Sequence, residues 1–262
     1  MSLLLGGVGS AGASGGGGGG PTYWTPNDEA GLIAWFDVAD LGRYNTTTDT
    51  WTARWGSLSF VAASSGPLTT TAGFSGSSNA LVFTDTTNTG LVIANPGFTE
   101  CVFVIAMNVV TTADQVLIWN RALSGFGVAG LAVNSTYGVY VRYGSGGAEP
   151  DDYTFAMPGE KLTITRHSNA NRIIRFNGET KISSSILNSG TQPASSDSFK
   201  LFRDVGDYNY IVQVAAVGLF TSASWSTGLA EKIEGFICHN NIGHSTSILP
   251  GGHPYKSTAP TV

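Results

Sequence analysis

The chain has 262 residues, of which 12% are charged, 42% are hydrophobic and 11% are aromatic. This composition is typical of one large domain built from short strands and polar turns. The net charge of −5 excludes the basic footprint of proteins that bind nucleic acid or anionic membranes, and two cysteines are too few for a disulfide framework.

The sequence contains no run of eighteen apolar residues, so it predicts no membrane span. Residues 1–5 carry no positive charge, which argues against a secretion signal. We therefore expect Cys101 and Cys238 to be free thiols in a chain that folds in a reducing bacterial cytoplasm.

Residues 1–20 hold ten glycines, six of them consecutive. Such a segment loses too much backbone entropy to order itself without a partner. Its four large apolar side chains are Leu3, Leu4, Leu5 and Val8. We expect these side chains to anchor residues 1–26 to a neighbouring subunit, with residues 27–262 forming a single sandwich domain. The alternative is that the tail packs on its own domain.

From Thr22 onward, short apolar segments alternate with turn residues, as in a chain of strands. Residues 100–110 are apolar on both alternate faces, which predicts a central strand covered on both sides. We expect hairpins between residues 127–133 and 138–143, between 161–167 and 172–176, and between 81–84 and 90–93. The remaining predicted strands are residues 32–36, 51–55, 57–62, 115–119, 199–203 and 210–220. The tryptophans at 35, 51, 55 and 225 are assigned to the core.

One helix is predicted, beginning near Ser226 and ending between His239 and Gly243. Ser226 is a good N-cap, and Leu229, Ile233, Phe236 and Ile237 then form one apolar stripe. Glu231 and Glu234 are expected on the solvated face opposite this stripe. The proline-rich residues 249–260 should run over the surface without forming a further element.

Two motifs give the sequence a specific resemblance. The run IEGFICHNNIG, followed by ILPGGHPYKSTAP, resembles the C-terminal signature of concanavalin A-like (laminin G-like) jelly-roll domains of tailed-phage virion proteins, usually IEGYLAHKWGL…LPxxHPYKxxAP. Upstream, GLIAWFDVAD at residues 31–40 is similar to their opening LVAWYDASD, and residues 81–83 match their buried L-x-F strand. The resemblance covers residues 27–260 and implies an all-β, two-sheet antiparallel sandwich with one C-terminal helix in a virion protein.

Catalytic chemistry has little support in the sequence. Glucanases on this fold need two neighbouring carboxylates, whereas the acidic residues here are scattered. The closest group, Glu149, Asp151 and Asp152, is predicted to be a solvated loop. The four histidines show no zinc-binding spacing, and His253 is expected to fasten the tail to the domain. Asp204 and Asp207 could lie near a calcium ion, but a polar turn is the simpler interpretation.

Glycan binding has a softer signature, namely exposed aromatic faces near polar side chains. Tyr140 and Arg142 share one face of a predicted strand, and Asp207, Tyr208 and Tyr210 form a second cluster. These five residues are the glycan-binding candidates, with rim packing as the simpler alternative for each.

The first functional hypothesis is a non-enzymatic structural protein of a tailed-phage virion: a tail fibre, a receptor-binding protein or a head decoration. Its expected partners are other virion proteins, reached through the N-terminal tail, and host surface polysaccharide; several copies per particle are expected. No nucleic acid, membrane, metal or cofactor is expected. The alternatives are a carbohydrate-binding adhesin outside a phage and a glycan depolymerase.

Overall fold

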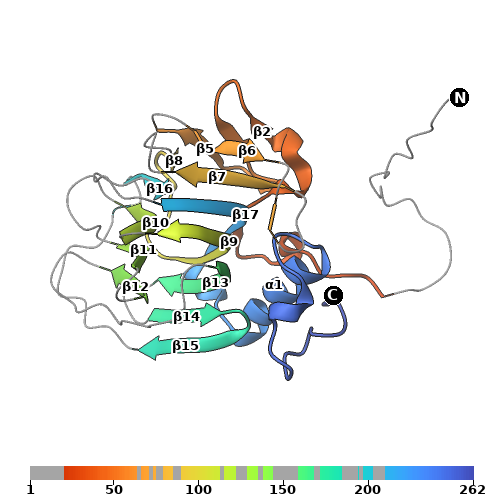
Figure 1. Cartoon of the computed structure of the whole chain (residues 1–262). Coiled ribbons are helices and arrows are strands. Elements are labelled where there is room, and N and C mark those ends of the chain that lie inside the picture. Colours follow the sequence, from red (N-terminus) through yellow and green to blue (C-terminus); the bar gives the residue numbers. More distant parts are fainter. Residues whose placement is uncertain are drawn as a thin grey trace, which may run out of the picture.

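The computed structural model describes residues 21–63, 66–70, 73–74, 79–84, 90–112, 115–121, 129–134, 138–143, 159–167, 172–184, 194, 197–202 and 210–262. Within them the chain forms two antiparallel sheets, one α-helix and several short 3-10 turns. The predicted two-sheet sandwich with one C-terminal helix is therefore confirmed (Figure 1).

The larger sheet has nine strands, and its main path is β15-β14-β13-β9-β17-β1-β4. The strand β17 holds this sheet together, because one of its edges pairs with β9 while the other pairs with β1 and, further along, with β7. Its strands are β1 (Leu32–Asp37), β4 (Trp55–Gly56), β6 (Leu68–Thr70), β7 (Ala80–Thr84), β9 (Cys101–Thr112), β13 (Gly159–His167), β14 (Arg172–Phe176), β15 (Glu179–Ser184) and β17 (Tyr210–Thr221).

The smaller sheet has eight strands in the order β12-β11-β10-β16-β8-β5-β3-β2. Its strands are β2 (Tyr44–Asn45), β3 (Thr50–Thr52), β5 (Ser59–Ala62), β8 (Leu91–Ile93), β10 (Gln115–Arg121), β11 (Ala129–Asn134), β12 (Gly138–Tyr143) and β16 (Phe199–Leu201). All of its ladders are antiparallel.

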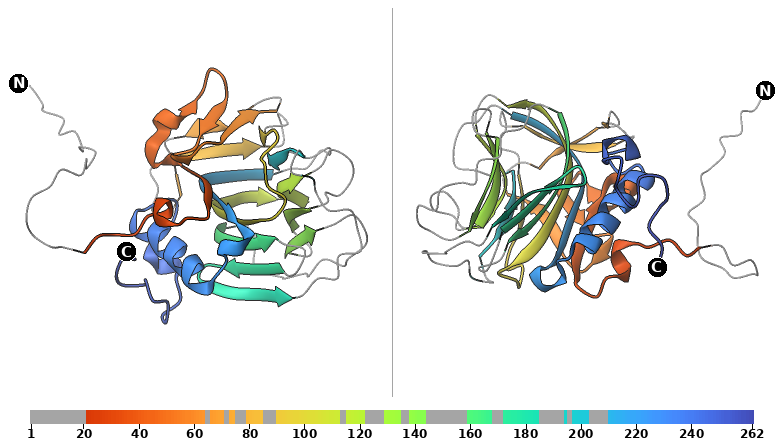
Figure 2. Two further views of the ribbon diagram at one scale, coloured as in Figure 1. Left: turned by 180° about the vertical axis from the view of Figure 1, so that it is seen from behind. Right: turned by 90° about the horizontal axis from the view of Figure 1, so that it is seen from below.

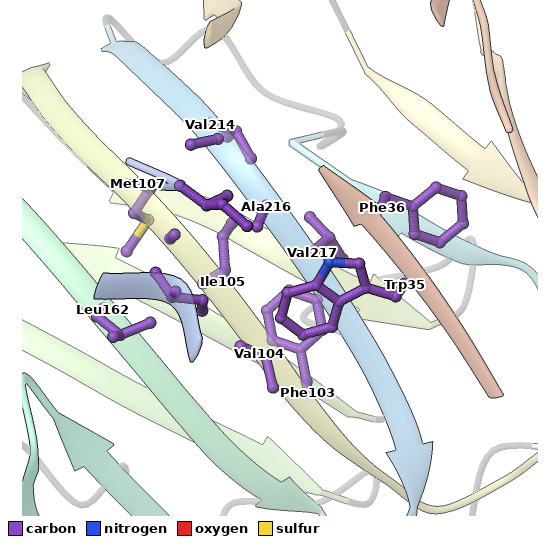
Figure 3. Close-up of a cluster of buried hydrophobic side chains, with 14 of the residues drawn as sticks. Trp35, Phe36, Phe103, Val104, Ile105, Met107, Leu162, Val214, Ala216 and Val217 are labelled. Atoms are coloured by element: carbon purple, nitrogen blue, oxygen red, sulfur yellow. The ribbon is translucent and has the colours of Figure 1, made fainter. Parts of the chain in front are cut away.

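The nine-stranded sheet lies between the smaller sheet and the helix α1 (Thr227–His239) (Figure 2). Neighbouring residues of β1 show both contacts: the Phe36 ring lies 4.8 Å from that of Phe60 in the smaller sheet, and the Trp35 ring lies 5.7 Å from that of Phe236 in α1. In β9, Phe103 likewise reaches Phe199 of β16. Figure 3 shows this buried cluster around β1, β9 and β17.

This double cover explains why β9 has no polar face. Residues 101–107 are all buried and β9 lies between β13 and β17, so the predicted central strand is confirmed; the double cover ends before Val110, which has 39% of its surface exposed. Burial of both faces removes apolar surface from water on both sides of the strand, which makes β9 a main source of stabilisation.

The helix α1 begins and ends as its sequence predicts. The Ser226 hydroxyl accepts a hydrogen bond from the amide of Leu229, which satisfies one of the unpaired donors of the first turn. At the other end, the amide of Ile242 donates to the carbonyl of Ile237, and Asn241 adopts a left-handed φ of 52°. These are the marks of a Schellman cap, with asparagine in the position that glycine usually takes.

Two of the predicted hairpins are present, β11 with β12 and β13 with β14. The predicted pairing of residues 81–84 with 90–93 is wrong, because β7 joins the larger sheet and β8 the smaller one. The turn composition of residues 85–89 therefore does not indicate which sheet receives the next strand. Three short strands, β2, β6 and β15, were not predicted.

The two cysteines are buried and unpaired with each other, as expected. Trp35 and Trp51 are fully buried, whereas Trp55 and Trp225 are partly buried against the same core. No helix among the described residues is long and apolar enough to cross a membrane.

Candidate functional site

A buried ionic cluster joins the helix, the large sheet and the C-terminal segment. Glu234, in the middle of α1, has no exposed surface. The guanidinium group of Arg175 on β14 binds it through two nitrogens, at 3.1 and 2.9 Å, and also donates to the Gly178 carbonyl and the Thr180 hydroxyl. The His253 Nε2 atom lies 2.9 Å from the same carboxylate. Donors from the protein itself therefore satisfy the Glu234 carboxylate.

The expectation that Glu234 faces solvent is wrong. Arg175 of β14 and His253 of the C-terminal segment cover Glu234, so this side of α1 is buried as well as the apolar stripe. Glu231, one turn earlier, is partly exposed as expected. The signal for a buried ion pair was Arg175 itself, an arginine within the apolar strand RIIRF, since buried arginines are normally paired.

The tautomer of His253 argues against a catalytic role for the Glu234–His253 pair. The amide of Tyr255 donates to Nδ1 of His253 at 3.2 Å, so the ring proton lies on Nε2 and is donated to Glu234. An imidazole that already uses both nitrogens in this way cannot accept a proton from a nucleophile. His253 instead holds the tail on the domain, the role expected for it.

The remaining signature residues also fasten the tail. The segment from residue 249 to 262 is called here the tail strap. The Lys256 ammonium group donates to the carbonyls of Thr246, Ser247 and Leu249, which closes a tight loop at the start of the strap. A Cβ atom on Gly235 would lie 2.6 Å from Cβ of Tyr255, so glycine at this position lets the strap pack directly on α1.

A second buried carboxylate lies at the upstream motif. Asp37 is fully buried and accepts hydrogen bonds from the Trp35 indole at 2.9 Å and the Ala39 amide at 3.1 Å. Arg54 lies 3.2 Å away and neutralises it. Because Trp35 contacts Phe236 of α1, both signature motifs meet at the helix. Each of the two buried carboxylates is thus paired with an arginine, and neither is paired with another acid.

The structure also forms an open groove of about 730 Å³ where the two ends of the chain meet. It is lined by Pro21, Tyr23 and Trp24, by His239 and Asn240 at the end of α1, and by strap residues Tyr255 and 257–261. We call it the terminal groove. This groove was not predicted, although Tyr23, like the predicted glycan-binding tyrosines, is an aromatic residue close to a polar side chain, here the hydroxyl-bearing Thr22.

Several of the predicted site residues lie outside the described part of the chain: Leu3, Leu4, Leu5, Val8, Asp207 and Tyr208, and also Glu149, Asp151, Asp152 and Asp204. Tyr140 and Arg142 are described only as backbone positions on β12, opposite Ala132 and Gly130. Tyr210 begins β17 in the other sheet. Tyr140 and Arg142 therefore belong to a different sheet from Tyr210.

The titratable groups near the helix are buried and shielded. Burial, reinforced by the negative charge of Glu234, raises the pKa of the Cys238 thiol to about 12, which keeps it protonated and unreactive. Burial lowers the pKa of His244 to about 4; a hydrogen bond with the Lys161 backbone opposes this shift, and the charge of Lys161 adds to it. Within the described residues, no three His, Cys, Asp or Glu side chains are grouped as metal ligands.

Comparison with known proteins identifies the fold. No protein-family model and no curated protein matches the sequence. Among solved structures, Trypanosoma rangeli sialidase in complex with sialic acid has a TM-score of 0.55 at 12% identity over 76% of this chain and 32% of that chain. The same sialidase with the inhibitor DANA gives 0.54 at 12% identity, over 84% and 34%.

The binding domain of botulinum neurotoxin serotype D/C is similar at a TM-score of 0.58 and 8% identity, over 81% of this chain and 53% of that chain. The chain thus spans about a third of the sialidase chains and about half of the toxin domain. At these identities the likeness concerns the fold alone, namely a two-sheet antiparallel β-sandwich.

Proposed function

We propose that this chain is a non-enzymatic component of a tailed-phage virion, which displays a lectin-like sandwich carried on its N-terminal segment. The observation that supports this proposal is the structural role of the motif residues that this chain shares with such virion domains. Asp37, Glu234, His253 and Lys256 all hold the fold closed, and none is left to act on a substrate. A domain whose motif residues hold the fold closed is suited to binding or display.

The proposal assigns attachment to the N-terminal segment. Three leucines and a valine in residues 1–20 can contribute roughly 1.5–3 kcal/mol each when buried at a contact. The described sandwich starts at Pro21, next to the tail strap, so both ends of the domain leave from one side (Figure 2).

The test is a particle-association assay. Full-length chain, a variant lacking residues 1–20, Leu4→Asp and the control Ser10→Asp are supplied at matched levels in cells that assemble particles, and purified particles are probed for each. We expect the deletion and Leu4→Asp to abolish incorporation, because a carboxylate is costly to bury. Ser10→Asp adds the same charge outside the leucines and should incorporate normally. Equal incorporation of all four would overturn the anchoring role.

The alternatives predict different results. An adhesin outside a phage would bind cell-surface glycans and never enter particles. A depolymerase would release reducing ends from host capsule or lipopolysaccharide, and the loss of that activity on changing one acidic residue would overturn the non-enzymatic assignment.

A further inference from the structure

The terminal groove is built by pairing of the chain's own ends. The amide of Trp24 donates to the carbonyl of Pro260, and the amide of Val262 donates to the carbonyl of Thr22, both at 3.0 Å. Between these bonds, Tyr23 and Thr261 form an antiparallel bridge. Alternation along this short ribbon buries Trp24 and leaves Tyr23 with 62% of its surface exposed.

The groove is held rigid from beneath. The Trp24 ring packs edge-on against Phe236 at 6.1 Å, and its indole nitrogen donates to Glu29 at 3.0 Å. Tyr255 follows His253, which is fixed on Glu234. The segment that contains Trp24 and the tail strap are both fastened to α1. The lining side chains are therefore preorganised, and ligand binding costs little side-chain entropy.

The lining carries polar groups but no formal charge. Among the described residues that line the groove, none is Asp, Glu, Lys or Arg. Ser257, Thr258 and Thr261 contribute hydroxyl-bearing side chains, and Asn240 contributes an amide whose nitrogen is already bound to the Phe236 carbonyl. The Nε2 atom of His239 donates to the Tyr255 carbonyl at 3.0 Å, which leaves Nδ1 as an acceptor.

We propose that the terminal groove binds a neutral, hydroxyl-rich glycan, with Tyr23 as the stacking face. The volume falls within the range of small-ligand sites, and exposed aromatic faces beside hydroxyl and amide groups suit the apolar and polar sides of a sugar ring. An acidic sugar would find no countercharge in this lining. The inference rests on the proposed role as a lectin-like binding domain and gives it a site outside the strands that carry Tyr140, Arg142 and Tyr210.

The competing occupant is residues 1–20 of the chain itself, the segment that precedes the lining residue Pro21. We favour the glycan because hydroxyl and amide groups in the lining would lose hydrogen bonds to water beneath leucine side chains. A peptide of residues 1–12 serves as the probe for this alternative.

The experiment measures binding of the full chain, by ligand-observed NMR and calorimetry, to a panel of neutral mono- and oligosaccharides that includes methyl glucosides, methyl galactosides, N-acetylglucosamine and maltotriose. Sialyllactose is the acidic probe. We expect at least one neutral sugar to bind at millimolar or tighter affinity and Tyr23→Ala to weaken it about tenfold, because stacking on the ring is lost. Thr258→Val should weaken it by a smaller factor.

Val61→Ala is the matched control, since Val61 is an exposed apolar residue on β5 of the smaller sheet and does not line the groove. This substitution should leave the affinity for the sugar unchanged. Circular dichroism verifies that each variant is folded; Tyr23 is exposed enough for its truncation to leave the core intact.

Each other outcome is decisive. Neutral-sugar binding that Tyr23→Ala leaves unchanged would overturn this site while leaving a lectin-like role standing. Preference for sialyllactose, or displacement of the sugar by the 1–12 peptide, would overturn the assigned ligand. Binding to no member of the panel would overturn the inference, whereas the particle assay reports separately on the proposed function.

Discussion

Two buried carboxylates, Asp37 and Glu234, are each neutralised by one arginine within the fold. Burial of a charge is costly unless a partner and hydrogen bonds replace water. Both acids meet this condition. The partners of Glu234 are Arg175 on β14 and His253 in the tail strap. The two acidic residues of the signature motifs therefore stabilise the fold by linking its elements.

Replacing Glu234 by Gln should destabilise the protein strongly. The substitution keeps the shape but leaves the Arg175 guanidinium, with 4% of its side chain exposed, buried beside a neutral amide. Breaking a buried pair by removing one charge typically costs about 3–5 kcal/mol, and we expect a loss near the lower end because the amide oxygen still accepts hydrogen bonds. Urea denaturation measures the change in the free energy of unfolding.

Glu231→Gln is the control for that prediction, since it makes the same chemical change one turn away on a partly exposed site. It should change stability by no more than about 0.5 kcal/mol. A Glu234→Gln effect as small as the control would mean that the guanidinium regains water or another partner, and that the cluster does not secure the strap.

At the scale of elements, the sequence predicts those whose pattern is local. The stripe on α1, its Ser226 cap and the doubly apolar β9 were all foreseen, because each follows from residues close together in the chain. Strands of two or three residues, such as β2 and β6, carry no periodic signal and were missed. The misassigned hairpin after β7 shows that turn residues reveal a change of direction but not which sheet receives the next strand.

Glycine has opposite effects at two positions of α1, which gives a test of strap packing. Glycine inside a helix costs up to about 1 kcal/mol relative to alanine. At Gly228 an added Cβ would meet no atom closer than 3.9 Å, so Gly228→Ala should stabilise the protein. At Gly235 the Cβ would lie 2.6 Å from Cβ of Tyr255 and 3.1 Å from Cδ of Pro260, so Gly235→Ala should destabilise it by roughly 1–3 kcal/mol.

Thermal and urea unfolding of the two alanine variants measure these opposite signs. If both variants gain stability, the strap moves off the helix without cost. That result would also argue against a preorganised terminal groove.

For the whole molecule, long-range pairing limited what the sequence could predict. The resemblance of the two motifs indicated the sandwich, yet nothing in the spacing of residues 23 and 261 predicts that they form a bridge. The terminal groove and the Arg175–Glu234–His253 cluster both depend on such distant contacts. The predicted glycan candidates were chosen from local composition alone, which cannot indicate that Tyr140 and Tyr210 belong to different sheets.

The stability of the whole fold should fall as the pH drops from about 6.5 to about 4, in part through His244. This histidine is buried after α1, edge-on to Phe74 at 5.3 Å and beside Lys161. Its pKa is lowered to about 4, against 6.5 when unfolded, because burial outweighs a hydrogen bond with the Lys161 backbone that raises the pKa; the charge of Lys161 lowers it further. The unfolded state therefore binds the proton first in this window, so each step of acidification favours unfolding; below pH 4 both states are protonated and the loss is complete.

The full effect of His244 amounts to about 3.5 kcal/mol at most, given roughly 1.4 kcal/mol per pKa unit. His244→Gln removes the titration while the carboxylates still titrate in both proteins, so their contributions cancel in the difference between the two. Urea unfolding at a series of pH values should therefore show the stability difference between wild type and variant shifting by 1–3 kcal/mol, to the disadvantage of wild type, as the pH falls through this window. A constant difference would mean that the ring gains water or a carboxylate partner on protonation, and that the turn after α1 opens at low cost.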